Sequence, residues 1–182
     1  MSELSGHVLQ DLPRRTRASK FRPTALFLIP LAAILFQVYL PRFVEYLAYL
    51  ELPLLVTVYF GLMRRSQIHG LLIGASIGLA QDSLGDLPVG MFGIVKTLLG
   101  YFAASVSQRF DVDNPMIRLI LGFFFFFFHH FFYWVLTRAL LGQQRPFDVQ
   151  QTLVLGVLNA AVALPLFAAL DRMREPAGGD LR

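Results

Sequence analysis

The chain has 182 residues, of which 55% are hydrophobic and only 15% are charged, which makes a water-soluble globular protein a poor interpretation. The mean hydropathy of +0.57 points the same way. A net charge of +4 does not indicate nucleic-acid binding, because the basic residues lie in short clusters between apolar stretches, as is typical of membrane proteins.

Residues 1–23 are predicted to form a basic N-terminal arm, since they carry five Lys or Arg residues against two acidic ones. Basic clusters beside a membrane span stay in the cytoplasm, where they face anionic lipid. Residues 24–171 then form a single transmembrane domain, and residues 172–182 a short cytoplasmic tail.

Apolar segments of membrane-spanning length follow one another along the transmembrane domain. At about 20 residues per crossing, they supply about six helices. Pro53 fits the first turn of the second helix, which is short when counted from Leu52, so we expect that helix to begin earlier or to tilt. The remaining expected spans are residues 24–40, 67–84, a fourth ending near Ser107, 117–141 and 149–170. The predicted fold class is an all-α integral membrane protein, a bundle of about six transmembrane helices.

The connections between these spans indicate an orientation. With the N-terminus inside, the inner segments hold twelve Lys or Arg residues, and the outer segments hold only Arg42, Arg138 and Arg145. The positive-inside bias therefore predicts that both ends of the chain lie in the cytoplasm.

The third segment carries glycines at four-residue spacing, Gly70, Gly74 and Gly78. This spacing places all three on one helix face, which can approach another backbone closely. We expect this face to pack within the hairpin of the third and fourth segments or against the membrane helix of a partner.

Asp82 and Lys96 are ionisable residues at membrane depth, which makes them functional candidates. Asp82 lies about one helical turn from the hairpin turn, and Lys96 lies deeper on the next helix. The long lysine side chain can close much of the gap. We expect an ion pair that locks the hairpin, in preference to a proton relay or a substrate site.

The fifth segment contains six consecutive phenylalanines followed by His129 and His130. Adjacent residues on a helix point about 100° apart, so the two histidines are expected to pack or to lie at the interface and not to bind a metal together. The phenylalanine run is expected to face lipid. No nucleophile with a positioned base is found in the sequence, so we expect no catalytic residue, no metal and no cofactor.

The segment from Gly74 to Gly93, continuing from Lys96 to Tyr101, resembles the signature region of the MreD family. The shared pattern is a glycine-faced helix, an aspartate, a short turn, a Pro-x-Gly step and a Gly-Tyr pair. Helix packing or partner binding is expected at Gly74, Gly78, Asp82, Pro88, Gly90, Gly93, Lys96, Gly100 and Tyr101.

The resemblance implies a non-enzymatic protein of the bacterial inner membrane that acts in the elongation complex. Its implied partners are an MreC-like protein, the MreB filament, a RodA-type glycosyltransferase, a penicillin-binding transpeptidase and membrane lipids. Members of the family also look similar in fold to the substrate-binding subunits of energy-coupling-factor transporters. A transporter subunit for a small vitamin-like solute is therefore the alternative. A membrane enzyme acting on a lipid-linked wall precursor, with Asp82 as acid or base, is a third possibility.

Overall fold

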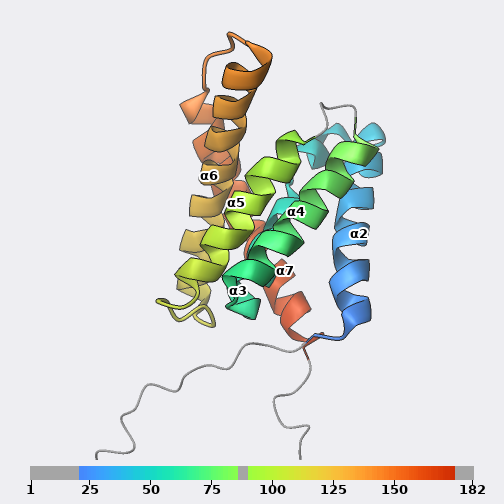
Figure 1. Cartoon of the computed structure of the whole chain (residues 1–182), viewed down its shortest axis with the longest axis vertical. Coiled ribbons are helices and arrows are strands. Elements are labelled where there is room, and N and C mark those ends of the chain that lie inside the picture. The colour runs from blue at the N-terminus through green and yellow to red at the C-terminus, as the bar shows by residue number, and fades with distance from the viewer. Residues whose placement is uncertain (1–20, 86–89, 175–182) are drawn as a thin grey trace, which may run out of the picture.

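The computed structural model describes residues 21–85 and 90–174, and in these ranges it contains α-helices and short 3₁₀ helices but no strand. The α-helices are α2 (Pro23–Tyr39), α3 (Leu52–Arg64), α4 (Gln67–Leu84), α5 (Met91–Val106), α6 (Pro115–Leu141) and α7 (Val149–Asp171). The 3₁₀ helices η1 (Leu40–Arg42) and η2 (Glu45–Tyr49) join α2 to α3. The predicted all-α fold is therefore confirmed (Figure 1).

Local sequence signals explain where several helices begin and end. Pro23 and Pro115 occupy the first turns of α2 and α6, where a missing backbone N–H has no effect. The Asp148 side chain accepts a hydrogen bond from the backbone N–H of Gln151 and so caps the start of α7. Gly142 ends α6 in the left-handed conformation (φ 64°), which glycine adopts without strain.

Helix α3 lies at the centre of the bundle. It contacts α2, α4, α5, α6 and α7, and every residue from Pro53 to Met63 is buried. The helices alternate in direction, so Phe21 and Arg174, the two ends of the described chain, lie at the same end of the bundle (Figure 1). Helices α4 and α5 form one closely packed hairpin, and α6 and α7 form another.

The surface of the bundle is that of a multi-pass membrane protein. Four elements are long and apolar enough to cross a membrane, namely residues 23–42, residues 45–64, α6 and α7. Helix α5 is a shorter apolar helix, and α4 carries polar residues at both ends. Large apolar side chains on the outside, such as Phe27 and Val157, are more than half exposed, as contact with lipid allows.

At the end of the bundle that holds both described chain ends, an ion-pair network joins three helices. The Arg118 guanidinium of α6 pairs with Asp171 of α7 and, at 3.3 Å, with Asp113. Arg174 pairs with the same two carboxylates. The Tyr59 hydroxyl of α3 donates a hydrogen bond of 2.9 Å to Asp171. The network fixes α3, α6 and α7 to one another at this end.

The second span and the phenylalanine run differ in detail from what was expected. The α-helix α3 begins at Leu52, but the apolar span to which it belongs begins earlier, at residue 45, because the separate 3₁₀ helix η2 precedes it. The phenylalanine run does not face only lipid: Phe124 is 50% exposed, but Phe125 and Phe126 are fully buried. A run of six residues covers more than one helical turn, so part of it must face the bundle interior.

The proposed division of the chain stays a prediction. Residues 1–20 of the basic arm and residues 175–182 of the tail lie outside the described residues, as do residues 86–89 between α4 and α5.

Candidate functional site

The glycine face of α4 packs directly on α5. A Cβ atom on Gly74 would overlap the backbone carbonyl group of Lys96, and one on Gly78 would overlap that of Phe92. Gly70 and Gly100 exclude side chains at each other's positions in the same way. The structure therefore places these glycines within the hairpin, and their face is not free for a partner helix.

Asp82 caps the beginning of α5. Its buried carboxylate accepts hydrogen bonds from the backbone N–H groups of Gly90 (2.9 Å), Phe92 (3.1 Å) and Gly93 (2.9 Å). The first N–H groups of a helix have no intrahelical acceptor, and the positive end of the helix dipole favours an anion. Gly90 has φ 102°, a conformation that a side chain would strain. Asp82 thus joins the end of α4 to the start of α5 through the backbone.

The expected ion pair between Asp82 and Lys96 is not formed in the described structure. The Lys96 side chain is fully buried, and its Nζ lies 3.4 Å from Nε2 of His129 on α6 and 4.3 Å from the centre of the Phe92 ring. The aspartate is already used by the three N–H groups, and Lys96 lies more than one helical turn deeper, where α6 is its neighbour. The lysine therefore joins α5 to α6 instead of closing the α4–α5 hairpin.

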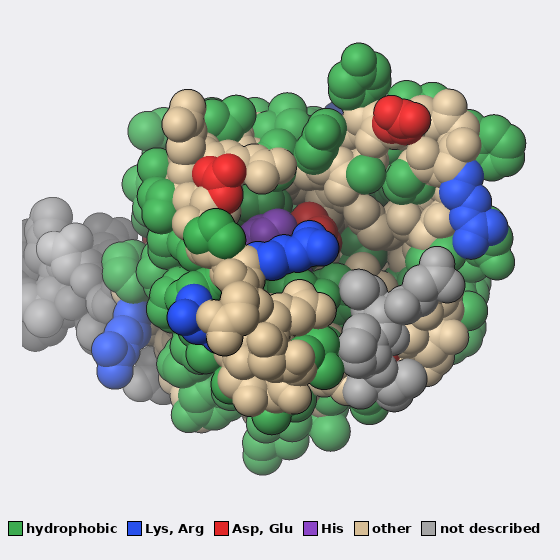
Figure 2. Space-filling view, turned by 90° about the horizontal axis from the view of Figure 1, so that it is seen from above, with side chains coloured by type: hydrophobic (Ala, Val, Ile, Leu, Met, Phe, Trp, Pro, Cys, Tyr) green, Lys and Arg blue, Asp and Glu red, His purple; other side chains and the backbone are tan. Residues whose placement is uncertain are grey.

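Lys96 belongs to a larger buried polar cluster. His129 stacks on the Phe92 ring with 5.6 Å between ring centres. Of the six buried side-chain atoms that have no hydrogen-bond partner among the described residues, three belong to this cluster: Nδ1 of His129, Nε2 of His130 and Oε2 of Glu51. Figure 2 shows histidine, acidic and basic side chains near one another on the surface at the end opposite the described chain ends, and the fully buried Lys96 is not one of the visible basic side chains. Buried polar atoms without a hydrogen-bond partner inside a membrane bundle make this cluster a functional candidate.

Replacing Lys96 with methionine should leave the protein at least as stable as the wild type. The substitution keeps the apolar stem and removes a buried ammonium group that no carboxylate of the described chain pairs. The matched change Arg118→Met removes a guanidinium from the ion-pair network and should lower the free energy of unfolding by about 3 kcal/mol or more. Thermal unfolding in detergent measures both. An equal loss of stability in the two variants would show that Lys96 has an ionic partner.

The other predicted residues lie at the ends of the α4–α5 hairpin. Gly93 is buried beside Leu79, and Tyr101 lies on the outside of α5, 38% exposed, with its ring edge-on to Phe102. Pro88 lies outside the described residues. Helix periodicity was sufficient to place the residues of one hairpin together.

Helix periodicity did not predict contacts between segments that are distant in the sequence. Asn159 of α7 is fully buried, accepts a hydrogen bond from the backbone N–H of Glu51 (2.8 Å) and donates one to the carbonyl of Tyr49 (2.8 Å). It thereby holds the segment between η2 and α3 in place. A polar amide in the apolar stretch of α7 was the available signal for this contact.

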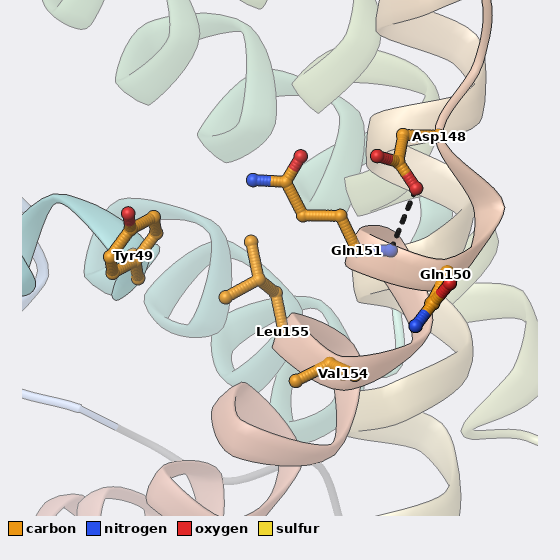
Figure 3. Close-up of a pocket in the computed structure, with 6 residues that line it drawn as sticks. All are labelled: Tyr49, Asp148, Gln150, Gln151, Val154 and Leu155. Carbon is orange, nitrogen blue, oxygen red and sulfur yellow. Dashed lines mark hydrogen bonds between the residues drawn. The ribbon is translucent and has the colours of Figure 1, made fainter.

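A groove lies beside the hydrogen bonds of Asn159, between η2 and the first turns of α7. Its volume is about 420 Å³, and it is lined by Tyr49, Asp148, Gln150, Gln151, Val154 and Leu155. Tyr49 and the Gln151 side chain extend into it from opposite sides, while Asp148 is turned to the backbone of its own helix (Figure 3). In the described part of the chain, no group of three His, Asp or Glu side chains is arranged to hold a metal ion.

Comparison with known proteins gives one match. The model of the family described as rod shape-determining protein MreD matches residues 19–174. Nothing matches among curated proteins or solved structures. The similarity in fold to the subunits of energy-coupling-factor transporters therefore stays a prediction.

Proposed function

The chain belongs to the MreD family of rod shape-determining proteins, and from this premise we propose that it is a non-enzymatic component of the elongation complex, required for lateral peptidoglycan synthesis. The observation that carries the proposal is the family match, which covers most of the chain, including the six α-helices of the described residues, α2 to α7. The bacterial inner membrane is its proposed location.

The proposed partners are an MreC-like protein and, through the same complex, MreB, a RodA-type glycosyltransferase and a penicillin-binding transpeptidase. Both termini are proposed to lie in the cytoplasm. Support comes from the basic residues Arg64, Arg65, Arg109 and Arg172, which belong to the chain segments at the end of the bundle that holds both described chain ends (Figure 1).

The surface proposed for the membrane helix of the MreC-like partner is a groove between α2 and α4. It has a volume of about 350 Å³, and it is lined almost entirely by apolar or small side chains: Pro23, Leu26, Phe27, Pro30, Leu31, Ile34, Leu72, Ile73, Ser76, Ile77 and Ala80. Small residues on the α4 wall let a helix backbone approach. Helix α5 already covers the glycine face of α4, so a partner helix cannot pack there. The groove beside α2 is an apolar, hollow surface of α4 on which a partner helix can pack.

Depletion and replacement in the native host test this function. Loss of the protein should turn rods into spheres and stop insertion of wall precursor along the side wall, as followed by microscopy with a fluorescent precursor. Wild-type protein should restore rods, whereas Ser76→Trp, which fills the groove, should not restore them and should reduce co-purification of the MreC-like protein at least tenfold.

The control is Val157→Trp, which adds the same bulk on the exposed face of α7 and should behave as the wild type. Unchanged rods with a new vitamin requirement after depletion would contradict the elongation role and favour the transporter alternative. Full co-purification with Ser76→Trp would contradict the groove but leave the role in shape intact.

A further inference from the structure

The buried polar cluster around Lys96 contains two opposite charges that do not pair. Glu51 directly precedes α3, Lys96 lies on α5, and the two are near enough to interact electrostatically. Neither side chain forms an ion pair with a described residue. The backbone N–H of Glu51 is held by Asn159 on α7, at 2.8 Å. Opposite charges inside a membrane bundle usually pair with each other, so these two can accommodate a third group that pairs with both.

The hydrogen-bonding groups of the cluster are also largely unused. The Lys96 ammonium group has three N–H donors, and its one hydrogen-bond partner among the described residues is Nε2 of His129, at 3.4 Å. An ammonium group can only donate, so Nε2 accepts and the ring proton of His129 lies on Nδ1, which is buried without a partner. Oε2 of Glu51 is a buried acceptor without a partner. The cluster therefore offers N–H donors at Lys96 and His129 and a carboxylate acceptor at Glu51.

Aromatic rings fix the buried donors in place. The Phe92 ring stacks on His129, with 5.6 Å between ring centres, and on Tyr133, with 5.1 Å. Its centre also lies 4.3 Å from Nζ of Lys96. An aromatic face stabilises a cation without using the N–H groups that point elsewhere. Lys96 can therefore stay charged at full burial and keep donors available for a ligand.

The cluster extends from the surface to the buried lysine. Lys96 lies five residues after Met91, the first residue of α5, which corresponds to about 8 Å along the helix axis. Glu51 and His130 are only half-buried. Histidine and acidic side chains are visible on the surface at this end of the bundle (Figure 2). The outer members of the cluster are thus accessible to a small solute from the end opposite the described chain ends.

We propose that this cluster binds a small free α-amino acid, with the carboxylate of the ligand on Lys96 and its ammonium group on Glu51. The charges of Lys96 and Glu51 cancel, and a zwitterion is also neutral overall, so its binding adds no net charge to the bundle interior. A simple anion would pair with Lys96 but would be repelled by Glu51, and a simple cation would meet the opposite problem. The neighbouring carboxylate of Asp82 is already used by three backbone N–H groups. This site goes beyond the proposed role in cell shape, and neither depends on the other.

The test uses the full-length protein in detergent, with thermal unfolding recorded at increasing concentrations of glycine or alanine. A ligand that binds the folded state raises the unfolding temperature as its concentration exceeds the Kd. Both amino acids should raise it, whereas propionate, which lacks the amine, and ethylamine, which lacks the carboxylate, should not. Lys96→Met and Glu51→Gln should each weaken alanine binding at least about tenfold, because each removes a charged hydrogen-bond partner of the ligand.

The matched control is Glu45→Gln, which makes the same change as Glu51→Gln at an exposed glutamate of η2 and should keep the wild-type response. An unfolding temperature that neither glycine nor alanine raises would overturn the proposal and leave water as the content of the cluster. An equal response to propionate or ethylamine would also overturn it, because one charge would then be sufficient for binding. Equal losses of affinity in Glu45→Gln and Glu51→Gln would show nonspecific attraction and exclude the site. None of these results affects the role in cell shape, which the depletion experiment tests separately.

Discussion

Replacing Asp82 with alanine is expected to lower the free energy of unfolding by at least about 3 kcal/mol, because three backbone N–H groups lose a charged acceptor. All three donors belong to residues that are buried (Gly93) or half-buried (Gly90 and Phe92). For a chain of this size the loss corresponds to a decrease of roughly 6–12 °C in the unfolding temperature. The single tryptophan, Trp134, provides a fluorescence signal for thermal unfolding in detergent.

The control for this change is Asp148→Ala. Asp148 is also a carboxylate at a helix start, but it is exposed and accepts one bond, from Gln151 at 2.9 Å. Its loss should lower stability by about 1 kcal/mol. Equal effects of the two substitutions would contradict the capping role of Asp82.

A milder change, Asp82→Asn, separates structure from chemistry. Asparagine keeps one acceptor oxygen for the α5 N–H groups but is not an acid or base. Rod shape in cells that carry a folded Asp82→Asn protein would argue against the enzyme alternative. Loss of shape with normal stability would favour it.

The second large effect is expected at Gly74. In Gly74→Ala the new Cβ would lie 2.7 Å from the Lys96 carbonyl carbon and closer still to its oxygen. Both are backbone atoms, so α4 and α5 must separate, and we expect a loss of about 3 kcal/mol or more in the free energy of unfolding, as for severe overpacking. The same unfolding assay measures it.

Gly122→Ala is the matched control, since it also adds a methyl group to a buried helical glycine. There the new Cβ would lie 3.3 Å from the Ala163 Cβ, a contact that a small shift relieves. Alanine also favours the helix by about 1 kcal/mol over glycine, which offsets part of the crowding. A Gly74→Ala protein as stable as Gly122→Ala would mean that the hairpin separates easily. Leucine at Gly74 and Gly78, whose side chain is larger still, is likewise expected to prevent folding and not only to weaken partner binding.

Helix bounds were largely predictable, because polar residues stop an apolar segment abruptly. Residues 67–84 were predicted as the third segment, and α4 is Gln67–Leu84. The beginning of α3 was less predictable, since residues 43–51 mix apolar and acidic side chains without a helical period. Pro53 in the first turn was a better guide than the length of the apolar segment.

The candidate site was predictable in its members but not in its contacts. Sequence spacing indicated that Asp82 and Lys96 belong to one hairpin, but opposite charges are not the only partners available to a carboxylate. Helix α5 offers it free N–H groups within reach, and Lys96 instead reaches His129, 33 residues away. Contacts between helices that are distant in sequence depend on how the bundle closes, which one sequence alone does not determine.

The unequal lengths of the two hairpins affect the surrounding bilayer. Helix α6 has 27 residues and extends beyond α5, which has 16 residues, corresponding to about 40 Å and 24 Å respectively (Figure 1). A hydrocarbon layer of about 30 Å cannot match both, so lipids beside α4 and α5 must compress, at a fraction of a kcal/mol for each ångström of mismatch. Another protein with an equally short span relieves that deformation when it moves next to α4 and α5. The lipid itself therefore favours assembly on this side of the bundle, before any side chains touch.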